Sequence, residues 1–395
     1  MKYFGTDGIR GVYGRTITEQ LAFKIGLAAA YLCGEIIVAR DTRVSGKSLS
    51  DALISGLVRG GADVVDIGVM PTPALSYLCR KRSMYGIMVT ASHNPPSYNG
   101  FKFFMRDGYK PSPNFETAIE TCSPSYAGGG KKREENAIEE YCEYAASGFN
   151  LRGIEVALDC AYGATSEIAP VIFEMAGAKV VKLSCLTDGE KINVECGATD
   201  PHLIVGKKLA FAFDGDGDRA VMASDGDIVD GDSVLYSLFC LTKPTGVVGT
   251  VMSNSALSRA IINDGGKFVA TAVGDRAVAF AMRRLGYELG GEKSGHYIIS
   301  PNRSGDGIYS ALRLCASKVR RLDLLPCREF SVDGGDAEGA ARKFVVKDAR
   351  VVIRRSGTEP KVRVMAECEN EEKLDEIIWR KNEFSGCIRR KIERA

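Results

Sequence analysis

The chain has 395 residues, of which 45% are hydrophobic and 26% charged, and its formal net charge is +2. This length exceeds what one hydrophobic core normally supports, so we expect two to four domains. The near-neutral charge excludes the strongly basic surface typical of nucleic-acid-binding proteins, and no apolar run is long enough to span a membrane. We therefore expect neither nucleic acid nor a membrane as a partner.

The N-terminal segment lacks the apolar core of a signal peptide, and none of the twelve cysteines stands in a CxxC pair. These features favour buried, reduced thiols in a cytoplasmic protein. A zinc site is the alternative, although the chain offers only three histidines as further ligands.

A strand–helix–strand pattern occurs three times, in residues 35–67, 153–181 and 246–269. Each copy has a short apolar strand, a helical stretch, a turn of small residues and a second strand. This order predicts a right-handed βαβ unit in a largely parallel sheet. The copies are about 100 residues apart and predict three related α/β domains.

The C-terminal part does not repeat this pattern. Residues 322–331 resemble a linker, residues 349–353 and 361–367 alternate as strands do, and an amphipathic helix is expected from about residue 371 to 381. The predicted fold class is therefore α/β, with three related domains of mixed, largely parallel sheets and a smaller C-terminal α+β domain. The expected domains span 1–150, 151–243, 244–322 and 323–395.

The strongest chemical motif is an acidic loop directly after the apolar run 209–213. It places Asp214, Asp216 and Asp218 at alternate positions, separated by glycines and followed by Arg219. Three converging carboxylates need a positive charge, and hard divalent cations prefer such oxygen ligands. A solvated acidic turn is the alternative. An EF-hand calcium loop is excluded, because Arg219 stands where the sixth-position glycine is required.

A second motif follows the apolar strand 85–89. Ser92 and His93 stand in a loop that continues with Asn94 and Pro95. Ligands of α/β sheets bind at the carboxyl ends of strands, which makes Ser92 a candidate functional hydroxyl. An ordinary turn and a Ser–His nucleophile pair are the alternatives, although side chains at consecutive positions usually diverge.

Two further loops carry polar groups suited to a phosphosugar. The segment 354–360 joins two arginines to hydroxyls and a glycine, which favours phosphate binding, with a charged hairpin turn as the alternative. The segment 290–296 offers a carboxylate, a hydroxyl and an imidazole between glycines, and could equally be a surface loop. Near the N-terminus, residues 5–11 place Arg10 on a Gly-rich loop. Neither GxGxxG after a strand nor GxxxxGK[ST] is present, so nicotinamide and nucleoside-triphosphate chemistry lose support.

Together and in this order, the five motifs resemble the α-D-phosphohexomutase family over nearly the whole chain. Five motifs in matching order are far more specific than any one of them. The stretches 5–11, 192–200 and 273–276 are similar to the branch of this family that acts on hexosamine phosphates. The resemblance implies four domains around a deep central cleft.

The resemblance also assigns roles to individual residues. It implies that Ser92 is phosphorylated and, with Asp214, Asp216 and Asp218, binds Mg²⁺. The groups it places near the transferring phosphoryl group are Arg10, Lys102, His296 and Arg219. The groups it assigns to the substrate are Glu292, Ser294, Arg276, Arg354, Ser356, Gly357, Thr358 and Arg363.

The implied activity is an intramolecular phosphoryl transfer of the isomerase class. Phosphorylated Ser92 would interconvert glucosamine 6-phosphate and glucosamine 1-phosphate through a 1,6-bisphosphate, in a monomer or homodimer. Glucose or mannose phosphate is the alternative substrate, since few contacts distinguish a hydroxyl from an ammonium group. A sugar-phosphate-binding protein without turnover and a phosphatase that uses Asp214 as nucleophile are hypotheses of other classes. The general base stays open among His296, Lys102 and the substrate phosphate.

Overall fold

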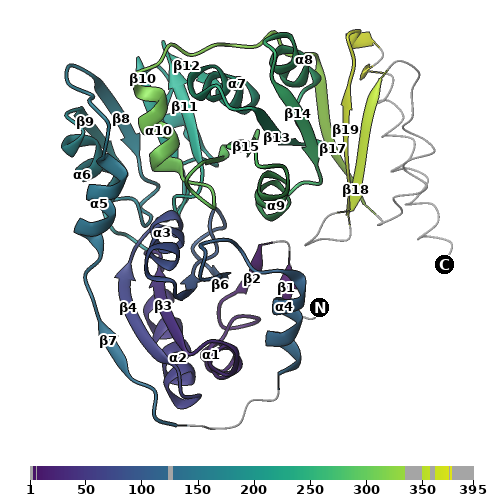
Figure 1. The fold of residues 1–395 in the computed structure, drawn as a ribbon. Helices are drawn as coiled ribbons and strands as arrows, with labels where there is room; N and C mark the ends of the chain where they lie inside the picture. The colour runs from purple at the N-terminus through teal and green to yellow at the C-terminus, as the bar shows by residue number, and fades with distance from the viewer. Residues whose placement is uncertain are drawn as a thin grey trace, which may run out of the picture.

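The computed structural model describes residues 3–5, 7–122, 128–333, 349–355, 361–372 and 374–375. Within these residues the strands form four sheets of seven, five, four and three strands. Figure 1 shows the first sheet with α1 to α4 (residues 19–121) at the bottom, the second and third sheets side by side above it with α5 (Ile138–Ala146) next to α6 (Ile168–Met175), and the fourth sheet at the right edge. The predicted fold class is confirmed.

The first sheet is mixed and has helices on both faces. Its strand order is β1-β2-β6-β5-β3-β4-β7, in which β3, β4, β5 and β7 run parallel to one another and β6 pairs antiparallel with β5. Its strands are β1 (Phe4–Gly5), β2 (Gly8–Val12), β3 (Glu35–Arg40), β4 (Asp63–Val69), β5 (Tyr85–Val89), β6 (Tyr98–Phe104) and β7 (Lys132–Glu134). Its helices are α1 (Glu19–Leu32), α2 (Gly46–Arg59), α3 (Thr72–Arg82), α4 (Pro113–Thr121) and α5 (Ile138–Ala146).

The apolar strand β3 shows why both faces are covered. Ile36 and Val38 belong to the core formed with α1 and α2, whereas Ile37 and Ala39 belong to the core formed with α3 and α5. Successive side chains of a strand point to opposite faces, so a continuous apolar strand must be buried on two sides.

The second and third sheets repeat the parallel unit. The second has the order β12-β11-β10-β8-β9 and the third β14-β13-β15-β16. The second contains β8 (Glu155–Asp159), α6 (Ile168–Met175), β9 (Lys179–Leu183), the 3₁₀ turn η1 (Pro201–Ile204), β10 (Leu209–Phe213), β11 (Ala220–Ser224) and β12 (Asp227–Val229). The third, with its helices, contains α7 (Gly231–Thr242), β13 (Gly246–Thr250), α8 (Ser255–Asn263), β14 (Lys267–Thr271), α9 (Asp275–Leu285), β15 (Leu289–Glu292), β16 (His296–Ile299) and α10 (Gly307–Cys315).

The three predicted βαβ units are confirmed. In each, the two predicted strands pair in parallel, as β3 with β4, β8 with β9 and β13 with β14. One hydrophobic core runs continuously through the first three sheets. The predicted domain limits stay predictions.

The fourth sheet is antiparallel, with the order β17-β19-β18. Its strands are β17 (Cys327–Asp333), β18 (Arg350–Arg355) and β19 (Lys361–Glu367). The expected linker 322–331 is wrong from Cys327 onward, because β17 pairs with β19 along its whole length. Phe330 packs on the small separate core of this sheet. Because its neighbours in the sequence are polar, the strand pattern is hard to recognise there. The predicted helix 371–381 lies mostly outside the described residues.

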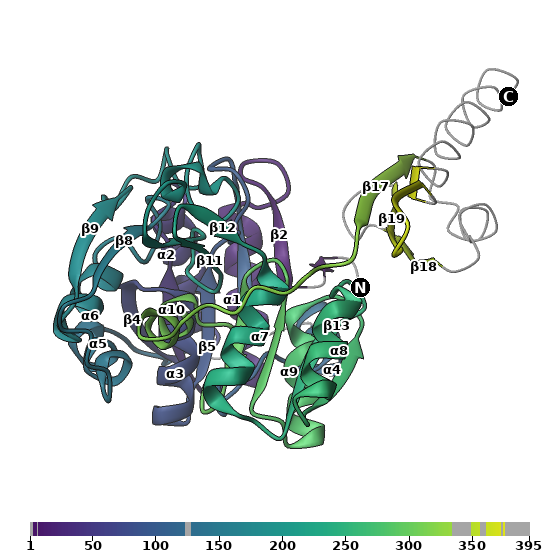
Figure 2. The ribbon, with the colours of Figure 1, turned by 90° about the horizontal axis from the view of Figure 1, so that it is seen from above.

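The fourth sheet stands apart from the other three, as Figure 2 shows from above. Arg350 anchors it by donating to the carbonyl oxygens of Val251 and Ser253, and Glu367 accepts the backbone N–H of Ser255. A polar anchor at one end of β18 and β19 therefore joins the fourth sheet to the start of α8. No described helix is long and apolar enough to cross a membrane.

Candidate functional site

The acidic loop lies at the carboxyl end of β10. Asp214, Asp216 and Asp218 are all buried, and each offers a carboxylate oxygen within 4.8 Å of the other two. Gly217 adopts a positive φ of 73°, which lets the loop turn back beside Thr165. The three carboxylates that the sequence predicted to converge therefore do so.

Ser92 meets this loop from the first sheet. Its Oγ donates to Asp214 Oδ2 over 2.7 Å, and the residue is 1% exposed. The backbone of Ser92 has φ 55°, in the left-handed region that residues with a side chain rarely adopt. Such strain persists only where surrounding contacts hold it, and it is common at functional sites.

Arg43 is one of the groups that hold the Ser92 loop. Its guanidinium donates to the carbonyl oxygens of Ser92 at 2.9 Å, Asn94 at 2.7 Å and Tyr98 at 2.9 Å, and to the Asp41 carboxylate at 3.0 Å. Arg43 is 1% exposed, so its charge depends on the buried Asp41. The geometry of the Ser92 loop is thus fixed by the buried ion pair of Arg43 and Asp41, which lies outside the five motifs.

Asn193 holds the same loop from the side of the second sheet. Its side-chain amide donates to the carbonyl oxygens of Ser92 at 2.9 Å and Asn94 at 3.1 Å. The stretch 192–200 was one of those that carried the family resemblance, and these contacts show that it helps to hold the Ser92 loop in place.

Lys102 on β6 lies between the two loops. Its Nζ is 2.7 Å from both Asp216 Oδ2 and Asp218 Oδ2, and Thr72 Oγ1 donates to Asp216 Oδ2 at 2.6 Å. Burial alone would lower the pKa of Lys102, but Asp216 and Asp218 raise it well above its usual value. Lys102 therefore remains an ammonium ion at neutral pH.

The charges of the acidic loop are unevenly compensated. Burial, together with Asp218 and Asp216, raises the pKa of Asp214 well above its usual value. Burial also acts to raise the pKa of Asp218, but Lys102 and His296 outweigh it and the pKa falls. The charge of Asp214 is therefore less fully compensated than that of Asp218, and an added cation would favour ionised Asp214.

The arrangement fits a divalent cation. Asp216 Oδ1 and Asp218 Oδ1 are buried without a hydrogen-bond partner, beside the Asp214 carboxylate. A buried carboxylate oxygen without a donor is costly, and a cation with oxygen ligands removes that cost.

Basic and acidic groups continue along one side of the loop. The Asp7 carboxylate contacts Arg10 and Lys110, and its Oδ2 lies 3.3 Å from Lys102 Nζ. Burial would raise the pKa of Asp7, but Lys102 and Lys110 hold it well below its usual value. Arg10 and Lys102 thus share the Asp7 carboxylate, and Arg10 Nε is buried without a hydrogen-bond partner. Their expected place near the transferring phosphoryl group stays a prediction.

The β15–β16 hairpin carries the expected sugar-binding residues. Glu292 pairs in register with His296, and Ser294 is exposed at the turn between them. Gly295, at φ 94°, packs on the carbonyl of Ala220, which in turn donates its N–H to the Gly295 carbonyl at 2.9 Å. This contact fixes the hairpin against the residue that follows Arg219 of the acidic loop.

His296 lies at the base of this hairpin, facing the acidic loop. It is 3% exposed, and its Nε2 is 3.4 Å from Asp275 Oδ2 and 4.0 Å from Asp218 Oδ2. Neither ring nitrogen has a hydrogen-bond partner. His93, beside Ser92, has its pKa lowered to about 3 by burial and by Arg219, so its ring is neutral.

Arg354 and Arg363 face each other in register on β18 and β19. Like charges directly opposite in a sheet are unfavourable unless an anion lies between them. Burial and the Arg363 charge lower the pKa of Arg354, and its Nε is buried without a partner. The pair suits an anion. Ser356, Gly357 and Thr358, expected at the same site, lie outside the described residues.

Arg276 forms its ion pair with the first part of the chain, not with the acidic loop. Its Nη1 lies 2.6 Å from Glu116 Oε2 on α4, in an ion pair between the third and the first sheet. The substrate contact expected of Arg276 stays a prediction.

The comparisons with known proteins agree with this site. Models of the phosphoglucomutase/phosphomannomutase domains match the chain, domain I over residues 1–127, domain III over 230–323 and the C-terminal domain over 323–379. The chain is 38% identical to phosphoglucosamine mutase of Caldanaerobacter subterraneus subsp. tengcongensis, over 99% of each chain. The chain belongs to the α-D-phosphohexomutase family.

Further phosphohexomutases support this placement. The phosphoglucosamine mutase of Finegoldia magna is 40% identical over 95% of this chain and 96% of its own. Among solved structures, a phosphoglucomutase/phosphomannomutase family protein of Burkholderia thailandensis superposes with a TM-score of 0.83 at 27% identity, covering 94% of each chain. A phosphomannomutase-like protein of Thermus thermophilus, at 22% identity and a TM-score of 0.76, shares the phosphohexomutase fold.

Several groups of this phosphohexomutase site escaped the sequence analysis. They are Asp7, Arg43, Thr72, Lys110 and Asp275. Arg43 and Thr72 lie outside the five motifs, and nothing in the sequence marks them. Asp7 and Asp275 stand inside the stretches 5–11 and 273–276 that carried the resemblance, and this was the available signal, although neither residue was given a role.

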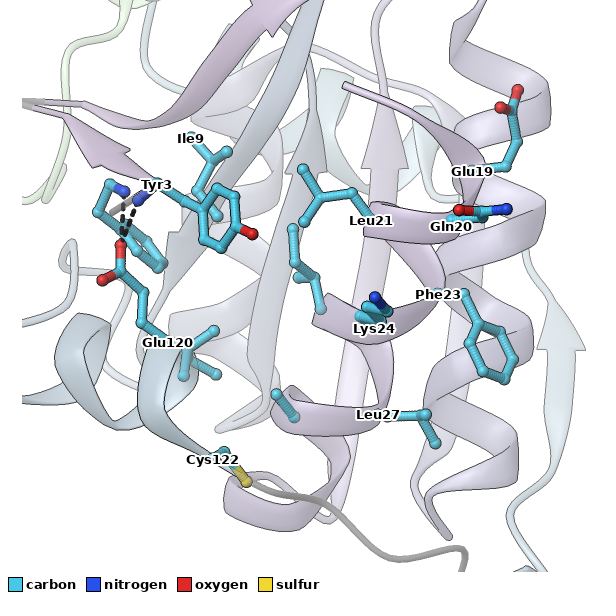
Figure 3. A pocket seen from close by; sticks show the side chains of 14 residues that line it. Tyr3, Ile9, Glu19, Gln20, Leu21, Phe23, Lys24, Leu27, Glu120 and Cys122 are labelled. Atoms are coloured by element: carbon cyan, nitrogen blue, oxygen red, sulfur yellow. Dashed lines mark hydrogen bonds between the residues drawn. The ribbon is translucent and has the colours of Figure 1, made fainter. Parts of the chain in front are cut away.

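An apolar groove of about 800 Å³ lies elsewhere on the first sheet, between α1 and α4 (Figure 3). Leu21, Lys24 and Leu27 line it from α1, and Glu120 of α4 accepts the backbone N–H groups of Tyr3 and Phe4 at its edge. None of the predicted site residues lines this groove.

Proposed function

We propose that this phosphohexomutase interconverts glucosamine 6-phosphate and glucosamine 1-phosphate, with Mg²⁺ held by Asp214, Asp216 and Asp218. The 2.7 Å contact between Ser92 Oγ and Asp214 Oδ2 carries the proposal. It supports a nucleophilic hydroxyl and a cation site at one point. The names and near-complete coverage of the bacterial relatives support the amino sugar.

Phosphorylated Ser92 donates its phosphoryl group to the free hydroxyl of the bound sugar phosphate. The bond between phosphorus and Ser92 Oγ breaks, a bond to the sugar oxygen forms, and a 1,6-bisphosphate results. After the bisphosphate turns end for end, Ser92 takes the other phosphoryl group. A cation at the acidic loop supplies charge neutralisation for this transfer.

The surrounding cations bind and orient the transferring group. Lys102 stays charged, as its raised pKa requires. It and Arg10 neutralise the equatorial oxygens, with Arg219 beside them. A permanently charged Lys102 cannot take a proton, so we assign the hydroxyl proton to His296, whose ring nitrogens have no hydrogen-bond partner.

The sugar and its other phosphate are held on the opposite side. In the hairpin, Glu292 accepts hydrogen bonds from sugar hydroxyls, and the Ser294 hydroxyl donates a hydrogen bond to the sugar. Arg354 and Arg363 bind the phosphate that does not react, with Ser356, Gly357 and Thr358 as further donors. Because guanidinium groups bind phosphate without contacting the sugar, one phosphate site accepts either end of the substrate.

Steady-state assays with glucosamine 6-phosphate, glucose 6-phosphate and mannose 6-phosphate test the proposal. We expect kcat/KM for the glucosamine substrate to be higher by about tenfold or more. A preference of that size for a glucose or mannose phosphate would overturn the sugar assignment and favour phosphoglucomutase or phosphomannomutase activity. Absence of turnover on all three would overturn the function. A cytoplasmic location and a monomer or homodimer stay predictions.

A further inference from the structure

The segment Gly274, Asp275 and Arg276 lies where the third sheet meets the first. It forms the start of α9, and each of its residues contacts a different group. The Gly274 N–H donates to Glu292 Oε1 at 3.0 Å. The Asp275 carboxylate contacts Lys110 Nζ, and its Oδ2 is 3.4 Å from His296 Nε2.

The third contact crosses to the first sheet. Arg276 Nη1 lies 2.6 Å from Glu116 Oε2, at an angle that makes an ion pair rather than a hydrogen bond. Glu116 is 2% exposed, and burial raises its pKa while Arg276 opposes that rise. Removal of one partner of a buried ion pair leaves the other charge unpaired, which is strongly unfavourable.

These contacts connect the sugar hairpin to the first sheet in an unbroken series. Glu292 and His296 belong to the hairpin, and the start of α9 contacts both. On the other side, Lys110 lies in the segment that joins β6 of the first sheet to α4, and Glu116 belongs to α4. The Ser92 loop is built on that same first sheet. Any shift of α9 against α4 therefore changes the distance between the sugar hairpin and the phosphoryl donor.

Resting on the function proposed above, we infer that Asp275 and Arg276 are positioning residues that dock the sugar hairpin against the first domain. Arg276 acts through Glu116, and Asp275 acts through Lys110 and His296. In this inference Arg276 binds the buried carboxylate of Glu116 and does not contact the substrate.

The same helix provides a matched control. Arg283, two turns further along α9, pairs with Asp107 of the first domain at 3.0 Å. Those side chains are 57% and 46% exposed and contact none of the described site residues named above, so the pair joins the same two parts of the chain outside the buried series. Exposed pairs of this kind contribute little.

A double-mutant cycle of Glu116→Gln and Arg276→Gln tests the inference. We expect each single variant to raise KM about tenfold while kcat falls less than about threefold, because hydroxyl contacts are misplaced and the phosphoryl donor is intact. The double variant should match the single variants. Arg276→Lys should recover part of the loss, and Arg283→Gln should leave KM unchanged.

A direct substrate contact gives a different result. If Arg276 binds substrate, Arg276→Gln costs as much in the Glu116→Gln background as in the wild type, and this additivity overturns the inference. A normal KM in Arg276→Gln also overturns it.

Hydrogen–deuterium exchange separates failure of the inference from failure of the proposed function. Exchange of residues 289–299 should rise in Glu116→Gln and Arg276→Gln and stay unchanged in Arg283→Gln. Unchanged exchange in all three overturns the docking role, whether or not the enzyme turns over a hexosamine phosphate. Loss of mutase activity on every sugar, with the expected exchange pattern, overturns only the function.

Discussion

Ser92 Oγ and Asp214 Oδ2 lie 2.7 Å apart, although 122 residues separate them in the chain. The serine loop follows a strand of the first sheet and the aspartate loop follows a strand of the second. Two carboxyl ends of strands, from two sheets, therefore face each other at this point. A hydroxyl and a cation site that meet there can exchange a phosphoryl group with a substrate, and neither loop could do so alone.

Replacement of Ser92 by alanine should abolish phosphorylation of the protein. The intact mass of the wild type should include a species heavier by about 80 Da, one phosphoryl group, and this species should be absent from Ser92→Ala. Ser97→Ala, an exposed serine of the same loop, is the control and should keep it. Persistence of the heavier species in Ser92→Ala, together with its loss in Asp214→Asn, would instead indicate phosphorylation of the aspartate.

Removal of divalent cations should lower both activity and stability. Without a cation the carboxylates of Asp214, Asp216 and Asp218 repel each other, so EDTA should lower the melting temperature and Mg²⁺ should restore it. At a concentration of 100 times Kd, a ligand bound only to the folded state stabilises it by about 2.7 kcal/mol. Thermal melts with and without Mg²⁺ measure the effect. An equal response in Asp216→Asn would place the cation elsewhere.

Arg43→Met should destabilise the fold. The substitution leaves the Asp41 carboxylate buried without its partner and removes the donors to the Ser92 loop, which should cost about 3–5 kcal/mol. Burial already raises the pKa of Asp41 against the opposing effect of Arg43. Urea unfolding measures the loss. Lys47→Met, which breaks an exposed pair with Asp51, should change stability by less than about 1 kcal/mol. A similar small change in Arg43→Met would contradict the positioning role.

Asp306 should make stability depend on pH. Burial raises the pKa of this carboxyl to about 7, above its value in the unfolded chain. The folded state therefore binds the proton more tightly, and the penalty for ionising Asp306 grows as pH rises from about 4 to about 7 and is constant above that range. Asp306→Asn keeps the cap of α10, where Asp306 accepts from Tyr309 N. The asparagine variant should be more stable than the wild type at pH 8, by up to about 4 kcal/mol, and nearly equal to it at pH 4. A pH-independent difference between their melting temperatures would contradict this assignment.

Much of the local structure follows from short-range patterns. The apolar runs 85–89 and 209–213 are β5 and β10 with the predicted bounds, because a buried strand of a covered sheet must be apolar on both faces. The error at β17 has the opposite cause. Its residues mix charged and apolar side chains, and only pairing with β19 makes them a strand.

Sequence alone singled out the acidic loop, the Ser92 loop, the segment 290–296 and the arginine loop, because the motifs in this order resemble one family although each by itself had another interpretation. Tertiary structure alone decided which groups meet: Lys102 between Asp216 and Asp218, Arg43 under the Ser92 loop, and Arg276 against Glu116. The physical reason is range. Propensity and periodicity act over a few residues, whereas a charge buried on one sheet selects a partner from another, and that choice becomes visible only when the sheets are packed.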